Sequence, residues 1–313
     1  MSASGFNITA VERDTGLSKD VLRMWERRYG FPLPERDAHG ERVYSTAQVE
    51  RLRLIKRLMD QGHRPGKLVG ATAEELARLA PRRPPAAPAP AGAECLDSLL
   101  DILRQHDVPA FQQAMQQQLA RQGLSRFVLD TVAPLSVLVG QAWEEGRFEI
   151  FEEHLFTEQT KRLLRQAIGN LPPGRGGPRI MLTSVPEEQH LLGLLMAEAL
   201  FALEGATCIS LGTQMPLPDI QRAAAAHRAD VVALSFSMAY PSRQIPSILL
   251  QLRSMLPMPL ALWVGGGATA RFTAPPGVEL IPDLEAAVTA LAAWRQRQDS
   301  AVLLALQNGP EAA

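Results

Sequence analysis

A proline-rich segment divides this chain. Residues 81–90 read PRRPPAAPAP, and each proline removes a backbone donor and disfavours helix, so we expect a semi-rigid, extended spacer. A chain of 313 residues also exceeds what one hydrophobic core usually supports. The sequence therefore predicts a multidomain protein, with one domain over residues 1–78 and a linker over residues 79–94.

The part after this linker changes pattern once more. Over residues 95–172 the apolar residues recur at helical spacing, which predicts a four-helix bundle. Over residues 173–298 short apolar runs alternate with helix-length segments, which predicts a Rossmann-like α/β domain with a parallel sheet. Residues 299–313 end in small residues and are expected to form a flexible tail.

Secondary structure in the α/β part follows from this alternation. The expected strands lie near residues 179–183, 206–211, 231–235, 260–264 and 278–280. The expected helices cover roughly residues 191–203, 218–227, 242–256 and 283–297. Because open parallel sheets bind ligands at the carboxyl ends of their strands, the residues that follow these strands are the first candidates for a site.

The charge balance distinguishes the front of the chain. Residues 1–70 carry 13 Lys or Arg against 9 Asp or Glu, whereas the whole chain has a formal net charge of −1. Cys95 and Cys208 are too few for a disulfide framework and fit no metal-ligand spacing, so we expect two buried thiols in a reducing compartment. With no signal-like start and no apolar run of membrane-spanning length, we expect a cytoplasmic protein away from membranes.

Residues 6–28 have the pattern of a helix, a turn and a second helix. Ser18 is placed to cap the second helix. Arg23 and Arg27 lie four residues apart and share one face, while Trp25 can anchor the helix to a core. Arginine-bearing faces are also common on solvated helices, so this face alone does not distinguish a DNA reader from a surface helix.

The next segment favours the DNA reader. Residues 36–44 read RDAHGERVY, with strand-like ends around a glycine, and predict a β-hairpin wing that presents Arg36 and Arg42 to phosphates. A third helix then closes the domain. With RMWERRYG at residues 23–30, this order resembles the MerR family of winged helix-turn-helix regulators over about residues 6–75.

This resemblance implies an all-α winged helix-turn-helix domain on double-stranded DNA. The residues expected at the DNA are Ser18, Lys19, Arg23, Arg27, Arg36, Arg42 and Tyr44. MerR relatives usually dimerise through a long helix after this module, but here the proline-rich linker intervenes. We therefore expect the back half to assemble a homo-oligomer, which would raise DNA affinity through effective concentration.

His190 is the candidate metal ligand of the back half. It follows the first predicted strand of the α/β domain, two residues after Glu188. Glu188 can accept a hydrogen bond from the imidazole Nδ1–H, which fixes the tautomer and leaves Nε2 free to bind a metal. A lone histidine after a strand is more often a hydrogen-bonded surface residue, so the context has to decide between the two interpretations.

Glycines and a serine supply that context. Gly193, at the start of the next helix, would let a bulky ligand approach the backbone. Ser235 ends one predicted strand, and Gly265 and Gly266 follow another, as expected for a narrow slot. These residues resemble the cobalamin-binding domains of methionine synthases and corrinoid proteins, which implies that His190 is the lower cobalt ligand and the slot holds the nucleotide tail.

The sequence departs from that family at two positions. Glu188 stands where the family commonly has Asp, and Ser237 stands where Leu often follows the pocket serine.

The helical region supplies the other face. Trp143 is followed after nine positions by Glu153 and His154, and Ile150 lies between them. Taken singly, Trp143 reads as a core residue and Glu153 as a solvated one. As a set they resemble the cap bundle of the CarH/LitR family of light-sensing repressors, which bind adenosylcobalamin.

With the MerR-like module in front, this resemblance covers nearly the whole chain. It implies adenosylcobalamin between Trp143 and His190, with contacts from Ile150, Glu153 and His154. It also implies a homotetramer or dimer of dimers that holds operator DNA in the dark and releases it in light. Glu144 follows Trp143 where the best-known members have a histidine, so the illuminated form is expected to lack a second histidine on cobalt unless His154 provides one.

Two other functions remain open. The bundle and the α/β domain also resemble corrinoid carriers that shuttle methyl groups, although the DNA reader argues against a carrier. A MerR-type regulator that senses a partner protein without cobalamin is the second alternative. No Ser-His-Asp arrangement, Gly-Lys-Ser phosphate loop or metalloprotease spacing is evident, so we expect no enzymatic activity.

Overall fold

The computed structural model describes residues 5–37, 40–60, 63–72, 75, 76, 79, 93–174 and 176–307. The chain divides into two compact units, Met1–Pro88 and Ala89–Ala313. The predicted linker over residues 79–94 lies largely outside the described residues, as do positions 38 and 39 at the turn of the predicted wing and the last six residues of the tail.

The first unit is a winged helix-turn-helix, as the sequence predicts. Its elements are β1 (Phe6–Asn7), α1 (Ile8–Thr15), α2 (Lys19–Tyr29), β2 (Glu35–Arg36), β3 (Arg42–Tyr44), α3 (Thr46–Asp60) and α4 (Pro65–Leu68). The wing is antiparallel and pairs in the order β1-β3-β2, so a small sheet joins a unit that the sequence predicts as all-α.

Local signals fix the helix-turn-helix. Gly16 ends α1 in the left-handed conformation, with φ of 68°, which a residue without a Cβ adopts at little cost. Ser18 caps α2, because its side chain accepts a hydrogen bond from the backbone N–H of Val21. Leu22 and Trp25 on the inner face of α2 are buried in the core of this unit.

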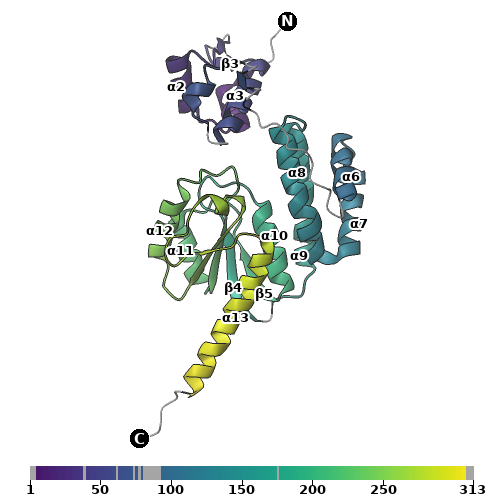
Figure 1. Cartoon of the computed structure of the whole chain (residues 1–313), viewed down its shortest axis with the longest axis vertical. Helices are drawn as coiled ribbons and strands as arrows, with labels where there is room; N and C mark the ends of the chain where they lie inside the picture. Colours follow the sequence, from purple (N-terminus) through teal and green to yellow (C-terminus); the bar gives the residue numbers. More distant parts are fainter. Residues whose placement is uncertain are drawn as a thin grey trace. The chain divides into compact units, whose positions relative to one another are not determined.

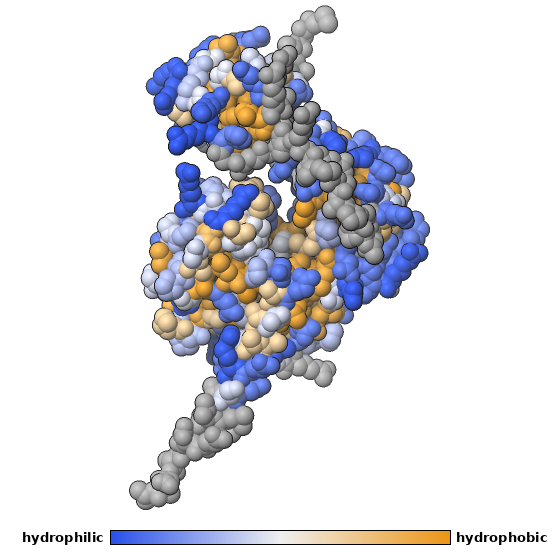
Figure 2. Space-filling view, viewed as in Figure 1, coloured by the Kyte–Doolittle hydropathy of each residue, from blue (hydrophilic) through white to orange (hydrophobic). Residues whose placement is uncertain are grey.

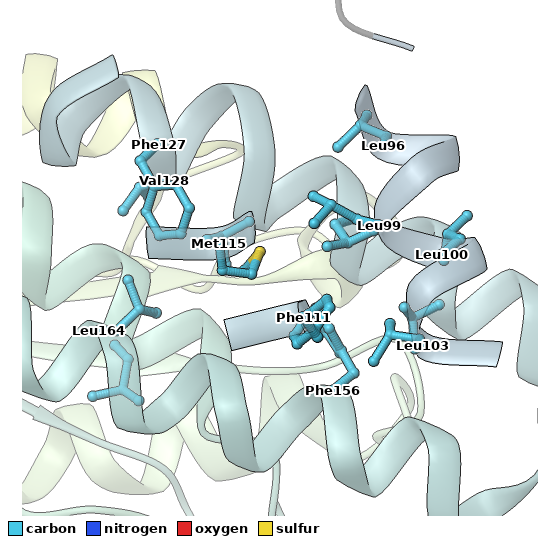
Figure 3. Close-up of a cluster of buried hydrophobic side chains, with 14 of the residues drawn as sticks. Leu96, Leu99, Leu100, Leu103, Phe111, Met115, Phe127, Val128, Phe156 and Leu164 are labelled. Atoms are coloured by element: carbon cyan, nitrogen blue, oxygen red, sulfur yellow. The ribbon is translucent and has the colours of Figure 1, made fainter. Parts of the chain in front are cut away.

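The second unit begins with a helical bundle (Figure 1). Its elements are α6 (Ala93–Arg104), α7 (Val108–Arg126), the π-helical segment η1 (Phe127–Val132), α8 (Ala133–Glu144) and α9 (Ile150–Gly169). Figure 3 shows side chains of α6, α7 and α9 meeting in one core, where the rings of Phe111 and Phe156 lie edge to face at 6.4 Å. In Figure 2 hydrophilic residues cover the outer side of this bundle.

The helical breaks differ in part from those expected. Asp107 caps α7, so the chain does break there, but at Gly123 it only kinks, with φ of 73°, and continues into η1. The continuous helical stretch Val108–Glu144 is long and apolar enough to cross a membrane by length and composition alone. The expectation that no apolar run reaches that length was therefore wrong, although Phe111, Met115 and Phe127 of this stretch lie in the bundle core.

The α/β part follows the bundle. Its elements are β4 (Gly176–Thr183), α10 (Leu192–Leu203), β5 (Ala206–Ser210), α11 (Leu217–Ala226), β6 (Val231–Ser235), α12 (Ile245–Met255), β7 (Ala261–Gly265), η2 (Gly267–Arg271), β8 (Glu279–Leu280) and α13 (Leu284–Gln307). All strand pairs are parallel, in the order β5-β4-β6-β7-β8. The chain direction across the sheet reverses between β4 and β6, which is where such sheets bind ligands.

Helices cover both faces of this sheet, with α11 and α12 on one side and α10 and α13 on the other (Figure 1). The last helix continues to Gln307 instead of ending near residue 297. The bundle and the α/β part belong to one compact unit, although the sequence suggests two domains.

Helix α10 joins the bundle to the sheet. Its sequence, LGLLMAEALFAL, is apolar on nearly every side, as expected of a helix that is buried all round. Leu194 and Phe201 face the sheet, whereas Leu195 and Leu200 belong to the bundle core. The bundle therefore packs on the helix that begins directly after the His190 loop.

We expect Leu195→Ala to lower the free energy of unfolding by about 2–5 kcal/mol, because Leu195 is fully buried and the substitution leaves a cavity between α10 and the bundle. Chemical denaturation of the purified protein measures this change. Leu250→Ala is the control, since Leu250 is exposed on α12 and its truncation should change stability by less than about 0.5 kcal/mol. Equal effects of the two substitutions would contradict the packing role of α10.

Candidate functional site

The His190 loop connects β4 to α10. The Nδ1 atom of His190 lies 2.7 Å from Oε1 of Glu188, and the backbone N–H of His190 donates to the same oxygen at 2.9 Å. Glu188 is buried, with a side chain 1% exposed, while the His190 side chain is 61% exposed. Nε2 of His190 has no hydrogen-bond partner among the described residues, so its lone pair is available to a ligand.

Ser237 completes the support of Glu188. Its backbone N–H and its Oγ donate to Oε2 of Glu188 at 2.7 and 2.9 Å. Both carboxylate oxygens are thus saturated by hydrogen bonds, as a buried charge requires. The sequence marks Glu188 and Ser237 as two separate departures from the corrinoid pattern, and the structure shows that the two residues contact each other.

These hydrogen bonds also set the protonation of the pair. The hydrogen bond to Glu188 raises the pKa of His190 above 6.5 and outweighs burial, which acts in the opposite direction. Burial acts to raise the pKa of Glu188, but the hydrogen bonds from His190 and Ser237 together lower it below 4.5. Between pH 4.5 and 6.5 the carboxylate of Glu188 is therefore charged and accepts the hydrogen bond from the imidazole of His190.

The slot residues meet at the ends of two strands. Ser235 and Gly265 are paired in register at the ends of β6 and β7. From the sequence, Gly193 is expected to leave room for a ligand. In the structure a Cβ on Gly193 would lie 2.7 Å from Oγ of Ser235, so this glycine also leaves room for the serine hydroxyl. Gly266 has φ of 98°, and a Cβ there would lie 2.3 Å from the carbonyl oxygen of Phe236, so only glycine fits.

The second set of predicted site residues lies on α8 and α9 of the bundle. Trp143, near the end of α8, is half-buried and packs partly on the bundle core, while Ile150 is the first residue of α9. Glu153 lies one turn into α9, and its charge acts on His190 to raise the pKa of the imidazole. Glu153 of the bundle therefore lies within electrostatic reach of His190 of the α/β part.

His154 is less closely involved. Its Nδ1 lies 2.8 Å from Oε2 of Glu153, and the side chain is 72% exposed. Glu153 also accepts a hydrogen bond from Thr157 at 2.8 Å. The carboxylate of Glu153 is thus oriented by its own helix, while His154 lies on the solvent side.

Two hollows in the second unit lie away from these residues. One of about 240 Å³ lies between the bundle, α10 and α13, lined by Ser125, Leu129, Leu200, Leu203, Glu204, Glu285 and Val288. The other, of about 90 Å³, lies between α7 and α9. None of the predicted cofactor residues lines either hollow.

The predicted DNA-binding residues fall into two groups. Arg27 is exposed on α2, and Arg23 on the same helix pairs with Asp20 at 3.3 Å, an exposed contact that a phosphate can replace. Lys19 lies 3.6 Å from Glu12 at the start of α2. Arg36 donates to the carbonyl oxygen of Gly40 at 2.7 Å within the wing.

The other two wing residues are less exposed. Tyr44 is fully buried in the core of the first unit, so its predicted contact with DNA was wrong. Alternation along β3 places its ring inward, whereas the sequence shows only a tyrosine at the end of a basic strand. Arg42 is half-buried and forms an ion pair with Glu26 of α2 at 2.8 Å, a contact that holds the wing on the second helix.

The cysteines are less buried than expected. Cys95 and Cys208 are both free and half-buried, so the prediction of two buried thiols was wrong in degree. Partial burial nevertheless raises the pKa of the Cys208 thiol to about 12, which keeps the thiol protonated.

Known proteins share both halves of this architecture. Residues 6–73 match the MerR HTH family regulatory proteins, and residues 95–168 match the B12 binding domain family. The HTH-type transcriptional repressor CarH of Myxococcus xanthus is 31% identical over 272 residues, which cover 86% of this chain and 91% of CarH. The HTH-type transcriptional repressor CarA of Myxococcus xanthus is 30% identical, over 84% of this chain and 87% of CarA.

A solved structure shares the fold of the second unit. The monomethylamine corrinoid protein of Methanosarcina barkeri superposes with a TM-score of 0.51 and 16% identity, over 64% of this chain and 99% of that one. The chain is therefore a MerR-type transcriptional regulator with a B12 binding domain. It belongs to the family of transcriptional repressors that includes CarH and CarA.

The arrangement around His190 fits a corrinoid. Its donor set is one imidazole with an open Nε2 and an Nδ1 fixed by a buried carboxylate, the form in which histidine binds metals most often. A proton on Nε2 competes with a metal for the same lone pair.

We expect Glu188→Gln to lower the pKa of His190 towards or below 6.5, because the substitution removes the charged acceptor. An NMR titration of the histidine ring in the cofactor-free protein measures this shift.

The two pKa shifts also make stability depend on pH. Because folding raises the pKa of His190, this residue stabilises the fold at pH values below its pKa in the unfolded chain. That contribution is lost as the pH rises through its pKa in the folded protein. The lowered pKa of Glu188 contributes above about 4.5 and is lost as pH falls.

The stability difference between wild type and Glu188→Gln should therefore be largest between about pH 4.5 and 6.5 and smaller at pH 9. Glu187→Gln is the matched control, since Glu187 is the neighbouring exposed carboxylate in the same loop. A difference that does not change with pH would contradict the charged hydrogen bond.

Proposed function

We propose that this protein represses transcription and that adenosylcobalamin, held between the bundle and the α/β part, controls its binding to DNA. The observation that carries the proposal is the His190 loop, in which a buried carboxylate fixes Nδ1 and leaves Nε2 open. In this proposal His190 is the lower cobalt ligand, and Ser235, Gly193, Gly265 and Gly266 border the slot for the nucleotide tail.

The upper side is assigned to the bundle. Trp143 and Ile150 would cover the corrin ring, and Glu153 would accept hydrogen bonds from the hydroxyls of an adenosyl group. His154 would contact that group only at its edge, since the side chain is exposed and turned to Glu153. The bound cofactor supplies a cobalt–carbon bond that light breaks.

Assembly is the second part of the proposal. The cofactor can favour an oligomer only by as much as it binds the assembled state more tightly than the free chain. A tetramer or dimer of dimers would then present several copies of the first unit to an operator, and loss of the adenosyl group in light would release it. Such a repressor would act on the chromosome in the cytoplasm.

A cofactor titration tests this proposal. We expect adenosylcobalamin added in the dark to the purified cofactor-free protein to cause assembly and tighten DNA binding at least tenfold, and green light to reverse both. His190→Ala should abolish all three effects, because the lower ligand is lost. His227→Ala is the control, since His227 lies at the end of α11 away from the loop and should behave as wild type.

Other outcomes would point to the alternatives. DNA binding that does not respond to the cofactor would overturn the proposal in favour of a regulator that senses a partner protein. Methyl transfer from bound methylcobalamin, without any effect on DNA binding, would favour a corrinoid carrier. Unchanged cofactor uptake by His190→Ala would remove the lower-ligand assignment.

The DNA-binding surface has its own test. We expect Arg27→Ala to weaken binding to any DNA sequence several-fold and to reduce the slope of log affinity against log salt by about 1, since one phosphate contact is lost. Fluorescence anisotropy at several salt concentrations measures both quantities. Arg222→Ala in α11 removes an arginine that is also exposed, from the second unit, and should leave the slope unchanged.

A further inference from the structure

The first turn of α9 carries Ile150, Glu153 and His154, three of the four bundle residues assigned to the upper face. Glu152, which lies between Ile150 and Glu153, holds this turn in place. Oε2 of Glu152 accepts a hydrogen bond from the backbone N–H of Glu149 at 2.7 Å, and the side chain of Glu149 caps the helix in return. The position of the upper face thus depends on the carboxylate of Glu152.

The other carboxylate oxygen of Glu152, Oε1, contacts a residue from a different part of the bundle. Nε2 of His106 lies 3.0 Å from Oε1 of Glu152, although the two residues are 46 positions apart in the chain. The Glu152 side chain is only 9% exposed, so its charge needs this partner. The His106 ring also lies 5.2 Å from the ring of Phe151 in the same turn of α9.

His106 is itself held in an unusual conformation. It lies in the turn between α6 and α7 with φ of 57°, a left-handed conformation that costs energy for a residue with a Cβ. A glycine would suit this backbone better, yet the position holds a histidine whose ring reaches across to α9. Asp107, the next residue, caps α7 and takes no part in this contact.

We propose that His106 and Glu152 are positioning residues that hold the first turn of α9 so that Glu153 faces the upper ligand of the cofactor. Neither residue touches the cofactor in this arrangement. The hydrogen bond from His106 fixes Glu152, Glu152 fixes the start of the helix, and the helix start places Ile150 and Glu153. The identity of the ligand in this inference rests on the proposed function. The connection from His106 through Glu152 to the start of α9 rests on the hydrogen bonds described above.

Two substitutions at one position separate the side chain from the backbone. His106→Gly accepts the left-handed backbone and removes the ring, whereas His106→Gln retains an N–H donor at a similar reach. We expect His106→Gly to bind adenosylcobalamin about tenfold more weakly than wild type, the effect of one hydrogen bond to a charged group. Its affinity for methylcobalamin, which has no large upper group, should change less than twofold, and His106→Gln should recover most of the loss.

Asp107→Ala is the matched control. This substitution removes the cap of α7 in the same turn but leaves the contact between His106 and Glu152 in place. It should therefore not change the ratio of the two affinities. The inference is overturned if His106→Gly retains the wild-type ratio or loses both corrinoids equally. It is also overturned if Asp107→Ala has the same effect, or if His106→Gln is no better than glycine.

Hydrogen exchange in the cofactor-free protein separates this inference from the proposed function. The backbone amides of residues 150–153 should exchange faster in His106→Gly than in wild type or Asp107→Ala, because the turn frays without its support. Unchanged exchange rates would overturn the positioning role. If wild type binds neither corrinoid while these amides respond as expected, the proposed function fails and the positioning of α9 by His106 stands.

Discussion

The burial of α10 on both sides is the constraint on which the second unit depends. Leu194 and Phe201 fill the space above the sheet, while Leu195 and Leu200 fill the bundle core. Because protein interiors are close-packed, a helix shared by two cores fixes the distance between them. The His190 loop ends where α10 begins, so the same packing that stabilises the unit also anchors one end of this loop.

Buried glutamates with histidine partners occur on both sides of the proposed cofactor site. On the α/β side Glu188 orients the imidazole of His190, and on the bundle side His106 is hydrogen-bonded to Glu152, whose carboxylate caps the start of α9. In each case the carboxylate is buried, so leaving it without its hydrogen bonds would be costly. The two carboxylates therefore give rigidity to the residues that would contact the cofactor, at the cost of burying charge.

The main elements of the fold could be predicted because the signals were local. Apolar runs placed β6 and β7, and the cap at Ser18 placed α2, each within a residue of its observed bounds. Contacts between distant segments could not be read in this way. The support of Glu188 by Ser237 joins two strand ends 49 positions apart, and the inward turn of Tyr44 depends on the pairing of β3 with its neighbours. Neither has a local pattern.

The sequence by itself determined the helix-turn-helix, the helical region, the parallel sheet and the candidate imidazole at position 190. These follow from backbone preferences and from the period of apolar residues, which act over a few neighbouring positions. Only the tertiary structure decided that bundle and sheet form one unit through the shared helix α10. It also decided that Arg42 binds Glu26 and that His106 supports α9, because such contacts depend on how complete elements pack.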